Sequence, residues 1–245
     1  MFINDGIEVK DEKVKAFLMI GQSNMAGRGE LDEVEPIENE NCFMLRMGRW
    51  QKMSDPVNPD RPITGIRMHS GVSLANSFAD AVSKAKGIKV GLIPCADGGT
   101  RLDQWMPGEI LFDHAVMQVK LAMRTSEICG IIWHQGESDC FSMENIMLYK
   151  DKFIKMISEL KAQTGIGDVP LIMGELHEGI DREWNIENRI PTLNAIFHEI
   201  AEVIPNCRVA SSKGLSLKPD GIHFDSKSCR EFGIRYFNEY IKQIM

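Results

Sequence analysis

The sequence lacks any long hydrophobic run. No apolar segment approaches the ~20 residues that a helix needs to cross a bilayer, so no membrane is expected as a partner. The first sixteen residues, Met1 to Ala16, are rich in Asp, Glu and Lys and contain no uninterrupted apolar core of a signal peptide. We therefore expect a cytoplasmic protein, although a secreted protein stripped of its leader would show the same sequence.

An excess of positive charge is also missing. Lys and Arg number 28 against 35 Asp and Glu, which gives a formal net charge of -7 at pH 7. Because binding to nucleic acid requires a basic surface, this balance disfavours nucleic acid and anionic membranes as partners. The composition indicates no particular oligomeric state.

Metal-binding and redox motifs are absent as well. The six cysteines are scattered without a CxxC pair, so we expect reduced, mostly buried thiols. The zinc motif HExxH does not occur, because His177-Glu178 is followed by no second histidine in register. A metal site built from His134, Glu137 and Asp139 is a weak alternative, since mixed ligands this close in sequence are poor evidence. The sequence therefore predicts no metal and no other cofactor.

The stretch from Phe17 to Gly27 is the feature around which the remaining motifs are arranged. Its apolar half, Phe17 to Ile20, is typical of a buried parallel strand, and it ends in a polar turn with Ser23 at its centre. Ligands of open α/β sheets bind just beyond the carboxyl ends of such strands, where a nucleophile would lie. The alternative is that Ser23 only caps a helix that begins at Asn24.

Strands and helices alternate along the rest of the chain with short links. This alternation predicts a parallel sheet with helices on both faces. The expected strands are 17–20, 41–47, 89–95, 130–133, 170–173 and 207–210, and the expected helices are 72–85, 111–122, 146–160, 190–200 and 232–244. The region 28–70 is expected to be long and irregular apart from its one strand, and to cover part of the active-site face. We expect one α/β domain over 1–245, with an N-terminal tail of 1–15.

Four polar segments carry the candidate functional residues. Three strands end in glycine-containing turns, and a fourth polar segment lies just before the closing helix. These segments are Gly21-Gln22-Ser23-Asn24, Asp97-Gly98-Gly99-Thr100, His134-Gln135-Gly136-Glu137 and Asp220-Gly221-Ile222-His223. Since the carboxyl ends of parallel strands share one edge of the sheet, the segments can converge there.

The chemistry available at that edge is acyl transfer. Ser23 can act as a nucleophile with His223 as its base, and Asp220 can reach the imidazole Nδ1 and fix its tautomer. The backbone N–H groups of Ser23 and Gly98 and the side-chain amide of Gln135 can form an oxyanion hole. The plainer alternatives are that Asp-x-x-His is a loop turn, that the glycine pair is ordinary turn chemistry and that Gln135 is a core polar residue.

The absence of G-x-S-x-G argues against the nucleophile turn of α/β-hydrolases. The four segments instead resemble the SGNH (GDSL-like) hydrolase superfamily, and within it the group of sialate O-acetylesterases and carbohydrate esterase family 6 acetylxylan esterases. The run His-Gln-Gly-Glu-Ser-Asp that begins at His134 is the most specific of them. The resemblance implies a three-layer α/β/α sandwich with a central five-stranded parallel sheet in flavodoxin-like order, and ester hydrolysis without a metal.

The resemblance also implies roles for individual residues. The nucleophile, the base and the partner of the base would be Ser23, His223 and Asp220, and the oxyanion donors would be Ser23, Gly98 and Gln135. In most SGNH relatives an asparagine takes the place that Gln135 has here. Glu137 is a second candidate for orienting His223, and Gly99 is expected to support the oxyanion turn.

Residues and resemblance together predict a serine esterase that removes O-acetyl groups from a carbohydrate, such as acetylxylan or a sialate, through an acetyl-enzyme intermediate. Gln22, Arg101 and Trp105 are candidate contacts to the substrate, and Trp50 and Trp184 are further candidate stacking surfaces. Two alternatives stay open. One is a lipase or thioesterase of the same superfamily that acts on longer acyl esters, and the other is a carbohydrate-binding protein on a degenerate hydrolase scaffold.

Overall fold

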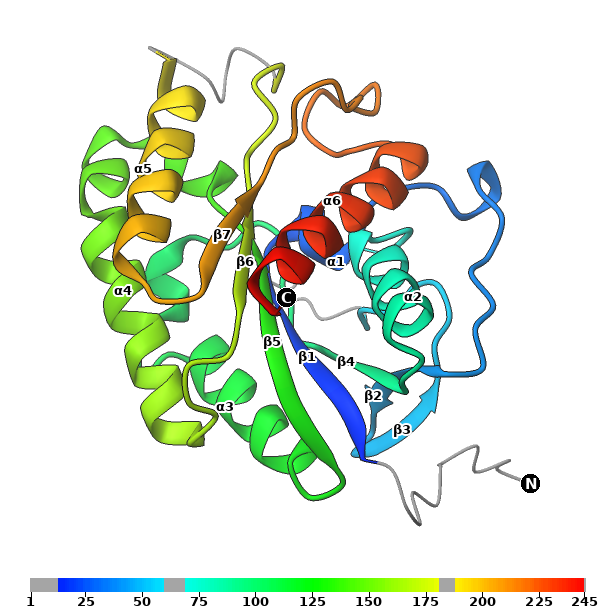
Figure 1. The fold of residues 1–245 in the computed structure, drawn as a ribbon. Coiled ribbons are helices and arrows are strands. Elements are labelled where there is room, and N and C mark those ends of the chain that lie inside the picture. The colour runs from blue at the N-terminus through cyan, green and yellow to red at the C-terminus, as the bar shows by residue number, and fades with distance from the viewer. Residues whose placement is uncertain (1–12, 60–68, 181–187, 245) are drawn as a thin grey trace.

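A central sheet organises the chain (Figure 1). The computed structural model describes residues 13–59, 69–180 and 188–244, and within them the sheet has seven strands in the order β3-β2-β4-β1-β5-β6-β7. The strands are β1 (Val14–Gly21), β2 (Cys42–Arg46), β3 (Arg49–Lys52), β4 (Val90–Pro94), β5 (Ser126–His134), β6 (Leu171–Gly174) and β7 (Cys207–Ala210). β2 and β3 pair antiparallel, and the other neighbouring strands pair in parallel.

Helices cover both faces of this sheet, which confirms the predicted three-layer fold. On one face lie α2 (Leu74–Lys86) and α6 (Ser226–Ile244), and on the other α3 (Ile110–Ala122), α4 (Met143–Thr164) and α5 (Arg189–Val203). Short helical turns follow three of the strands or lie in the first long connection, namely α1 (Ser23–Ala26), η1 (Leu31–Glu33), η2 (Leu102–Trp105) and η3 (Glu137–Phe141). None of the helices in the described ranges is long and apolar enough to cross a membrane.

The sheet is wider than the implied five strands. The flavodoxin-like order is present as β4-β1-β5-β6-β7, and β2 and β3 extend it at one edge. β2 was predicted, whereas β3 falls in the region expected to be irregular. A tight turn makes this hairpin, since Met47 and Gly48 both have positive φ, at 48° and 76°. β3 has a single apolar residue, so an edge strand of this kind carries no periodic signal.

The first strand begins earlier than predicted. β1 starts at Val14, within the segment assigned to the N-terminal tail, and Val14 is fully buried. The strand is a continuous buried run because both of its faces are covered, as in other central parallel strands. Residues 1–12 of the predicted tail lie outside the described residues.

Capping residues set the ends of the long helices. The hydroxyl of Ser73 accepts the N–H of Ala75 at 3.1 Å at the start of α2. The same helix ends at Gly87, whose φ of 65° is left-handed and favours glycine. Gly165 ends α4 in the same conformation. The predicted helices agree with the structure to within four residues at each end, except that α6 begins at Ser226, six residues before the predicted start at 232.

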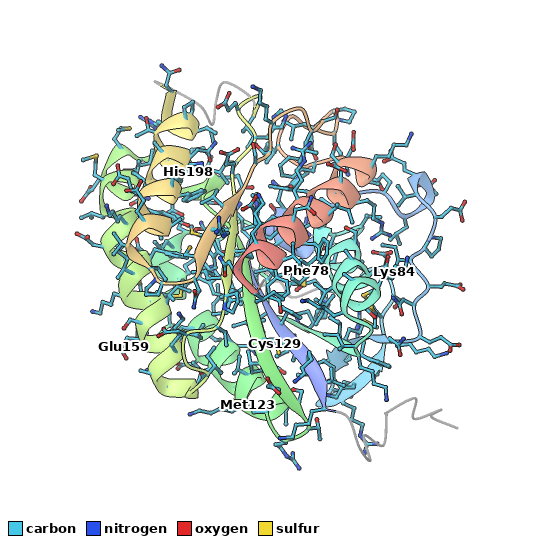
Figure 2. All side chains as sticks on the ribbon, in the orientation of Figure 1. Phe78, Lys84, Met123, Cys129, Glu159 and His198 are labelled. Carbon is cyan, nitrogen blue, oxygen red and sulfur yellow. The ribbon has the colours of Figure 1, made fainter. Side chains whose placement is uncertain are left out.

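An aromatic cluster joins the sheet to α2 and α6. Phe78, which Figure 2 labels, is fully buried between α2 and the sheet. Its ring lies edge-on to Phe17 of β1, with centroids 5.0 Å apart, and to Tyr240 of α6 at 5.9 Å. Three elements distant in sequence therefore share one packing unit.

Replacing Phe78 tests this unit. Phe78→Ala removes both ring contacts and leaves a cavity, so we expect the free energy of unfolding to fall by about 3–5 kcal/mol in urea denaturation. The control Met147→Ala changes a side chain that is largely exposed on α4, and should shift it by less than about 0.5 kcal/mol. Equal effects of the two substitutions would contradict the assignment of Phe78 to the core.

Candidate active site

A constrained glycine forms the turn that carries Ser23. Gly21, the last residue of β1, has a φ of +136°, and a Cβ built on it would lie only 2.1 Å from the carbonyl oxygen of His134. The next N–H, that of Gln22, donates to the same His134 oxygen at 2.8 Å. The backbone thus passes close to the end of β5 and then enters α1. Ser23 is the first residue of α1, so it does not cap a helix that starts at Asn24.

Ser23, His223 and Asp220 form one hydrogen-bonded series. Ser23 Oγ and His223 Nε2 are 3.0 Å apart, and His223 Nδ1 and Asp220 Oδ2 are 2.9 Å apart. The residues predicted as nucleophile, base and partner of the base therefore meet, although 200 positions separate Ser23 from His223. This is the geometry that activation of a hydroxyl by a neighbouring imidazole requires.

Asp220 also holds the backbone of its own turn. Its Oδ1 accepts the N–H groups of Ile222 at 3.0 Å and His223 at 2.9 Å. Partial burial raises the pKa of this carboxyl, but the two backbone N–H groups and the His223 imidazole lower it below its ordinary value overall. Asp220 therefore stays ionised and can accept the Nδ1 proton of His223.

The predicted oxyanion turn lies beside Ser23. The N–H of Asp97 donates to the carbonyl of Gly21 at 2.9 Å, which fixes the end of β4 against the end of β1. Gly98 and the exposed Gly99 follow, and the φ of Gly99 is +74°. Thr100 closes the turn, because its hydroxyl donates to the Asp97 carbonyl at 2.8 Å. The glycine turn and the serine turn share one edge of the sheet, as predicted.

Gln135 has a different role from the predicted one. Its side chain is completely buried, and its Nε2 donates to the carbonyl of Thr100 at 2.8 Å and to Asp139 Oδ2 at 2.6 Å. Its Oε1 accepts the hydroxyl of Tyr149 at 2.9 Å. Because its two amide hydrogens already have acceptors, Gln135 braces the turn that carries Gly98 and is not directed at substrate.

Gln22 is held on one side only. Its Oε1 accepts the N–H groups of Gly136 and Ser138, both at 3.3 Å, and lies 3.2 Å from Gln135 Nε2. Its Nε2 has no acceptor among the residues that the structure describes. Gln22 was predicted to contact substrate, and this fixed amide leaves a donor for that purpose.

Two of the three tryptophans predicted as sugar contacts, Trp50 and Trp105, belong to the core. Trp105 is 1% exposed, lies edge-on to Trp133 at 5.6 Å and donates to Thr100 Oγ1 at 3.1 Å. Trp50 is buried as well and donates to Thr125 Oγ1. Neither ring therefore has the exposed flat face on which a sugar could stack. Trp184 lies outside the described residues, whereas Arg101 is exposed beside the glycine turn.

Glu137 does not contact His223, so of the two carboxylates considered Asp220 is its partner. Glu137 is fully buried, accepts Asn24 Nδ2 at 2.6 Å and lies 3.4 Å from His134 Nε2. Burial raises the pKa of Glu137, but the neighbouring His134 imidazole and the hydrogen bond from Asn24 lower it overall. Sequence reasoning missed the contact between Asn24 and Glu137, since the only signal for Asn24 was its place after Ser23.

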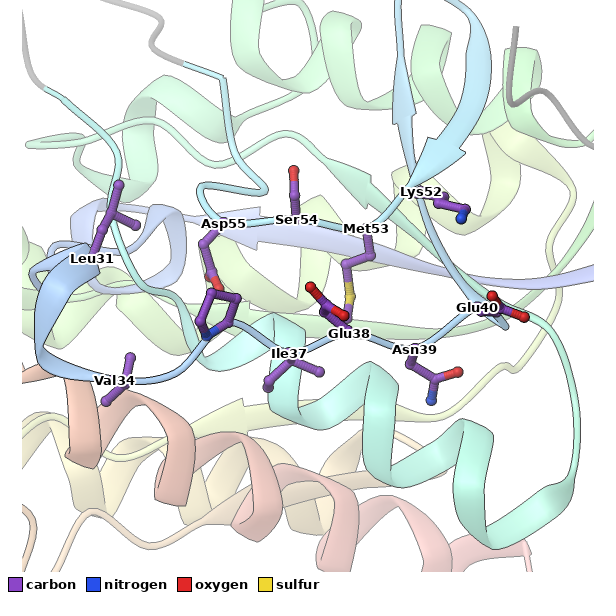
Figure 3. A pocket seen from close by; sticks show the side chains of 11 residues that line it. Leu31, Val34, Ile37, Glu38, Asn39, Glu40, Lys52, Met53, Ser54 and Asp55 are labelled. Carbon is purple, nitrogen blue, oxygen red and sulfur yellow. The ribbon is translucent and has the colours of Figure 1, made fainter. Parts of the chain in front are cut away.

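No metal-binding cluster occurs within residues 13–59, 69–180 and 188–244, where no three His, Cys, Asp or Glu side chains could hold an ion together. A cavity of about 750 Å³ lies elsewhere, between the segment Leu31–Glu40 and the segment Lys52–Asp55 (Figure 3). None of the predicted site residues lines it. The region 28–70 does reach the site edge at Asn58, which donates to the Ala96 carbonyl at 3.1 Å.

The sheet, the strand-end turns and the motifs define an SGNH-like hydrolase. Residues 13–242 match the family described as carbohydrate esterase, sialic acid-specific acetylesterase, and the chain belongs to that family of carbohydrate esterases.

Individual relatives agree with this assignment. A probable carbohydrate esterase of Arabidopsis thaliana is 26% identical over 247 residues, which cover 92% of this chain and 89% of the relative. The solved structure of that plant protein has a TM-score of 0.83 at 24% identity and covers 95% of this chain and 100% of its own. The structure of NanS has a TM-score of 0.74 at 14% identity and covers 94% and 97%. A carbohydrate acetylesterase from Xanthomonas citri has a TM-score of 0.61 at 16% identity, over 92% of this chain and 55% of its own. At these identities the structures show a common fold.

A buried carboxyl beneath the oxyanion turn makes stability depend on pH. Burial raises the pKa of Asp139 from 3.8 to about 6, against the lowering effect of Gln135 and the Leu102 N–H. A raised pKa in the folded state means that folding favours the protonated carboxyl, so its stabilising contribution is present below about pH 4 and is lost as pH rises through about 6.

Asp139→Asn removes this titration. Between about pH 7.5 and about pH 4.5, the free energy of unfolding of the wild type should rise relative to the variant by an amount on the order of 1–3 kcal/mol. Urea denaturation of both proteins at the two pH values measures this. A difference that stays constant, or that moves in favour of the variant on acidification, would contradict the assignment.

Proposed function

We propose that this protein is a serine esterase that removes O-acetyl groups from a carbohydrate through an acetyl-enzyme intermediate. The observation that carries the proposal is the series Ser23 Oγ, His223 and Asp220, with separations of 3.0 and 2.9 Å, beside the Gly98 turn. Membership of a carbohydrate esterase family supports an esterified carbohydrate as the class of substrate.

The first step transfers the acetyl group to Ser23. The hydroxyl oxygen attacks the acetyl carbonyl carbon while its proton passes to His223 Nε2. Ionised Asp220 accepts the hydrogen bond from Nδ1–H, which fixes the tautomer and stabilises the imidazolium. When the C–O bond to the sugar breaks, the imidazolium returns the proton to the departing sugar oxygen.

The second step releases acetate. A water molecule replaces the sugar, and His223 Nε2 takes its proton as the oxygen attacks the acetyl-enzyme. Collapse of the second tetrahedral intermediate breaks the bond to Ser23 Oγ, which regains the proton from the imidazolium. The enzyme returns to its starting state without a cofactor taking part in either step.

Backbone donors stabilise the negative charge of each tetrahedral intermediate. The N–H groups of Ser23 and Gly98 serve this role, since the Asp97–Gly21 hydrogen bond holds their two turns together. Gln135 contributes indirectly, because its hydrogen bond to the Thr100 carbonyl holds the turn that carries Gly98. Gln22 Nε2, which has no acceptor among the described residues, is a side-chain donor left for the substrate.

Substitution of the reacting residues tests the proposal. Ser23→Ala and His223→Ala should each lower kcat/KM for 4-nitrophenyl acetate by at least ~10³-fold, because nucleophile and base act as one unit. The matched controls are Ser83→Ala, a buried serine of α2 bonded to Ile88, and His198→Ala on the outside of α5 (labelled in Figure 2). Both should keep wild-type activity. A Ser23→Ala variant as active as wild type would refute a serine mechanism.

The acyl preference separates this function from its rivals. Release of acetate from a panel of acetylated sugars should occur with wild type and stop in Ser23→Ala. Rates on 4-nitrophenyl esters should fall from acetate to octanoate. A rise with chain length would favour a lipase or thioesterase, and sugar binding without turnover would favour a binding protein.

A further inference from the structure

The amide of Asn24 contacts the backbone on both sides of His223. Its Oδ1 accepts the N–H of Phe224 at 3.1 Å, and its Nδ2 donates to the carbonyl of Ile222 at 3.2 Å. Asn24 directly follows Ser23 in α1. Helix α1, which carries the Ser23 hydroxyl, is therefore also hydrogen-bonded to the segment that carries His223.

A buried carboxylate sets the direction of this amide. Glu137 Oε1 accepts Asn24 Nδ2 at 2.6 Å, and both side chains are buried. Rotating the amide by half a turn would place its oxygen against the Glu137 carboxylate and the Ile222 carbonyl, which are both acceptors. Only the observed orientation presents a donor to Ile222 and an acceptor to Phe224.

The His134 ring lies on the other side of the buried carboxylate. His134 Nε2 lies 3.4 Å from Glu137 Oε1, and His134 Nδ1 lies 3.2 Å from the hydroxyl of Tyr236. That hydroxyl donates to the Trp133 carbonyl at 2.8 Å. Glu137 and its neighbours thus place the Asn24 amide of α1 against buried side chains from the end of β5 and from α6.

His223 needs such a support because its own segment is irregular. Residues 219–223 form a turn, and the Asp220 side chain that orients the imidazole is 39% exposed. Asp220 lies on the same turn, so it fixes the ring relative to that turn and not relative to Ser23. The Asn24 contacts connect the turn to the helix of the nucleophile.

We propose that Asn24 and Glu137 are positioning residues: Glu137 orients the Asn24 amide, and Asn24 holds the backbone at Ile222 and Phe224 so that His223 Nε2 meets Ser23 Oγ. The inference rests on the proposed esterase function. It concerns the distance between base and nucleophile, where a displacement of about 1 Å can cost ~10²-fold in rate.

The first test uses Asn24→Ala with 4-nitrophenyl acetate. We expect kcat to fall ~10–100-fold with KM changed by less than about 3-fold, because substrate binding does not involve this amide. In a His223→Ala background the same substitution should cause no further loss, since Asn24 acts through that imidazole. Additive losses would overturn the inference.

A charge exchange supplies the rescue. Asn24→Asp sets two carboxylates against each other. Adding Glu137→Gln restores a hydrogen bond between an amide and a carboxylate and keeps the acceptor for Phe224, while the donor to Ile222 stays lost, so the recovery of kcat should be partial. We expect the double variant to recover at least ~10-fold of the kcat lost in Asn24→Asp. If Asn24→Ala does not fold, this pair decides, and absence of recovery in a folded double variant overturns the inference.

Asn194 provides a matched control. Its buried amide also makes two backbone hydrogen bonds, with the N–H and the carbonyl of Leu176 at 2.8 and 2.9 Å, away from His223. Asn194→Ala should lower the free energy of unfolding about as much as Asn24→Ala does, and should leave kcat unchanged. If Ser23→Ala and His223→Ala keep full activity, the esterase function fails. If they are inactive while Asn24→Ala has wild-type kcat, only the positioning role fails.

Discussion

Two backbone hydrogen bonds at Gly21 hold the site together. On one side the Gly21 carbonyl accepts the N–H of Asp97 at the end of β4, and on the other the N–H of Gln22 donates to His134 at the end of β5. They join the ends of three adjacent strands up to the point where the functional turns begin. The left-handed φ of Gly21 and its approach to His134 leave no room for a side chain. The reactive edge is thus a direct continuation of the central strands of the sheet.

The three acidic residues around this edge differ in how far they are buried. Asp220 lies on an exposed turn and contacts the imidazole, whereas Glu137 and Asp139 are buried and contact amides. The two buried carboxyl groups differ from each other in the direction of their pKa shift. Glu137 has a lowered pKa because His134 and Asn24 favour its charge, while Asp139 has a raised pKa because burial dominates. One carboxylate can therefore orient the base, while the other two stabilise the framework around it.

Sequence reasoning identified the elements whose signals are local. Buried strands and capped helices were found because apolar runs, helical periodicity and terminal glycines are readable one segment at a time. The convergence of Ser23 and Gly98 followed from the parallel sheet, whereas the placement of His223 came from its chemistry and the family resemblance. Strand β3 escaped because a short edge strand has little apolar content, and the tail was drawn too long because Val14 and Lys15 precede the apolar core of β1.

The direction of side chains could not be read in this way. Gln135 was assigned to the oxyanion hole because its type and position fit, but the hydrogen-bond acceptors at Thr100 and Asp139 decide where its amide points. Trp105 likewise packs on Trp133, a contact between two strand-end segments. The contact between Asn24 and the His223 segment spans 198 and 200 positions, and no local pattern encodes it.

The central claim is that Ser23 carries the acetyl group during turnover. Rapid acid quenching during the reaction with 4-nitrophenyl acetate, followed by mass spectrometry of peptides, measures this directly. We expect one acetyl group on the peptide that contains Ser23, absent from Ser23→Ala and lost when turnover is complete. Full turnover with no acetylated peptide, or with the acetyl group on another residue that is required for activity, would contradict it.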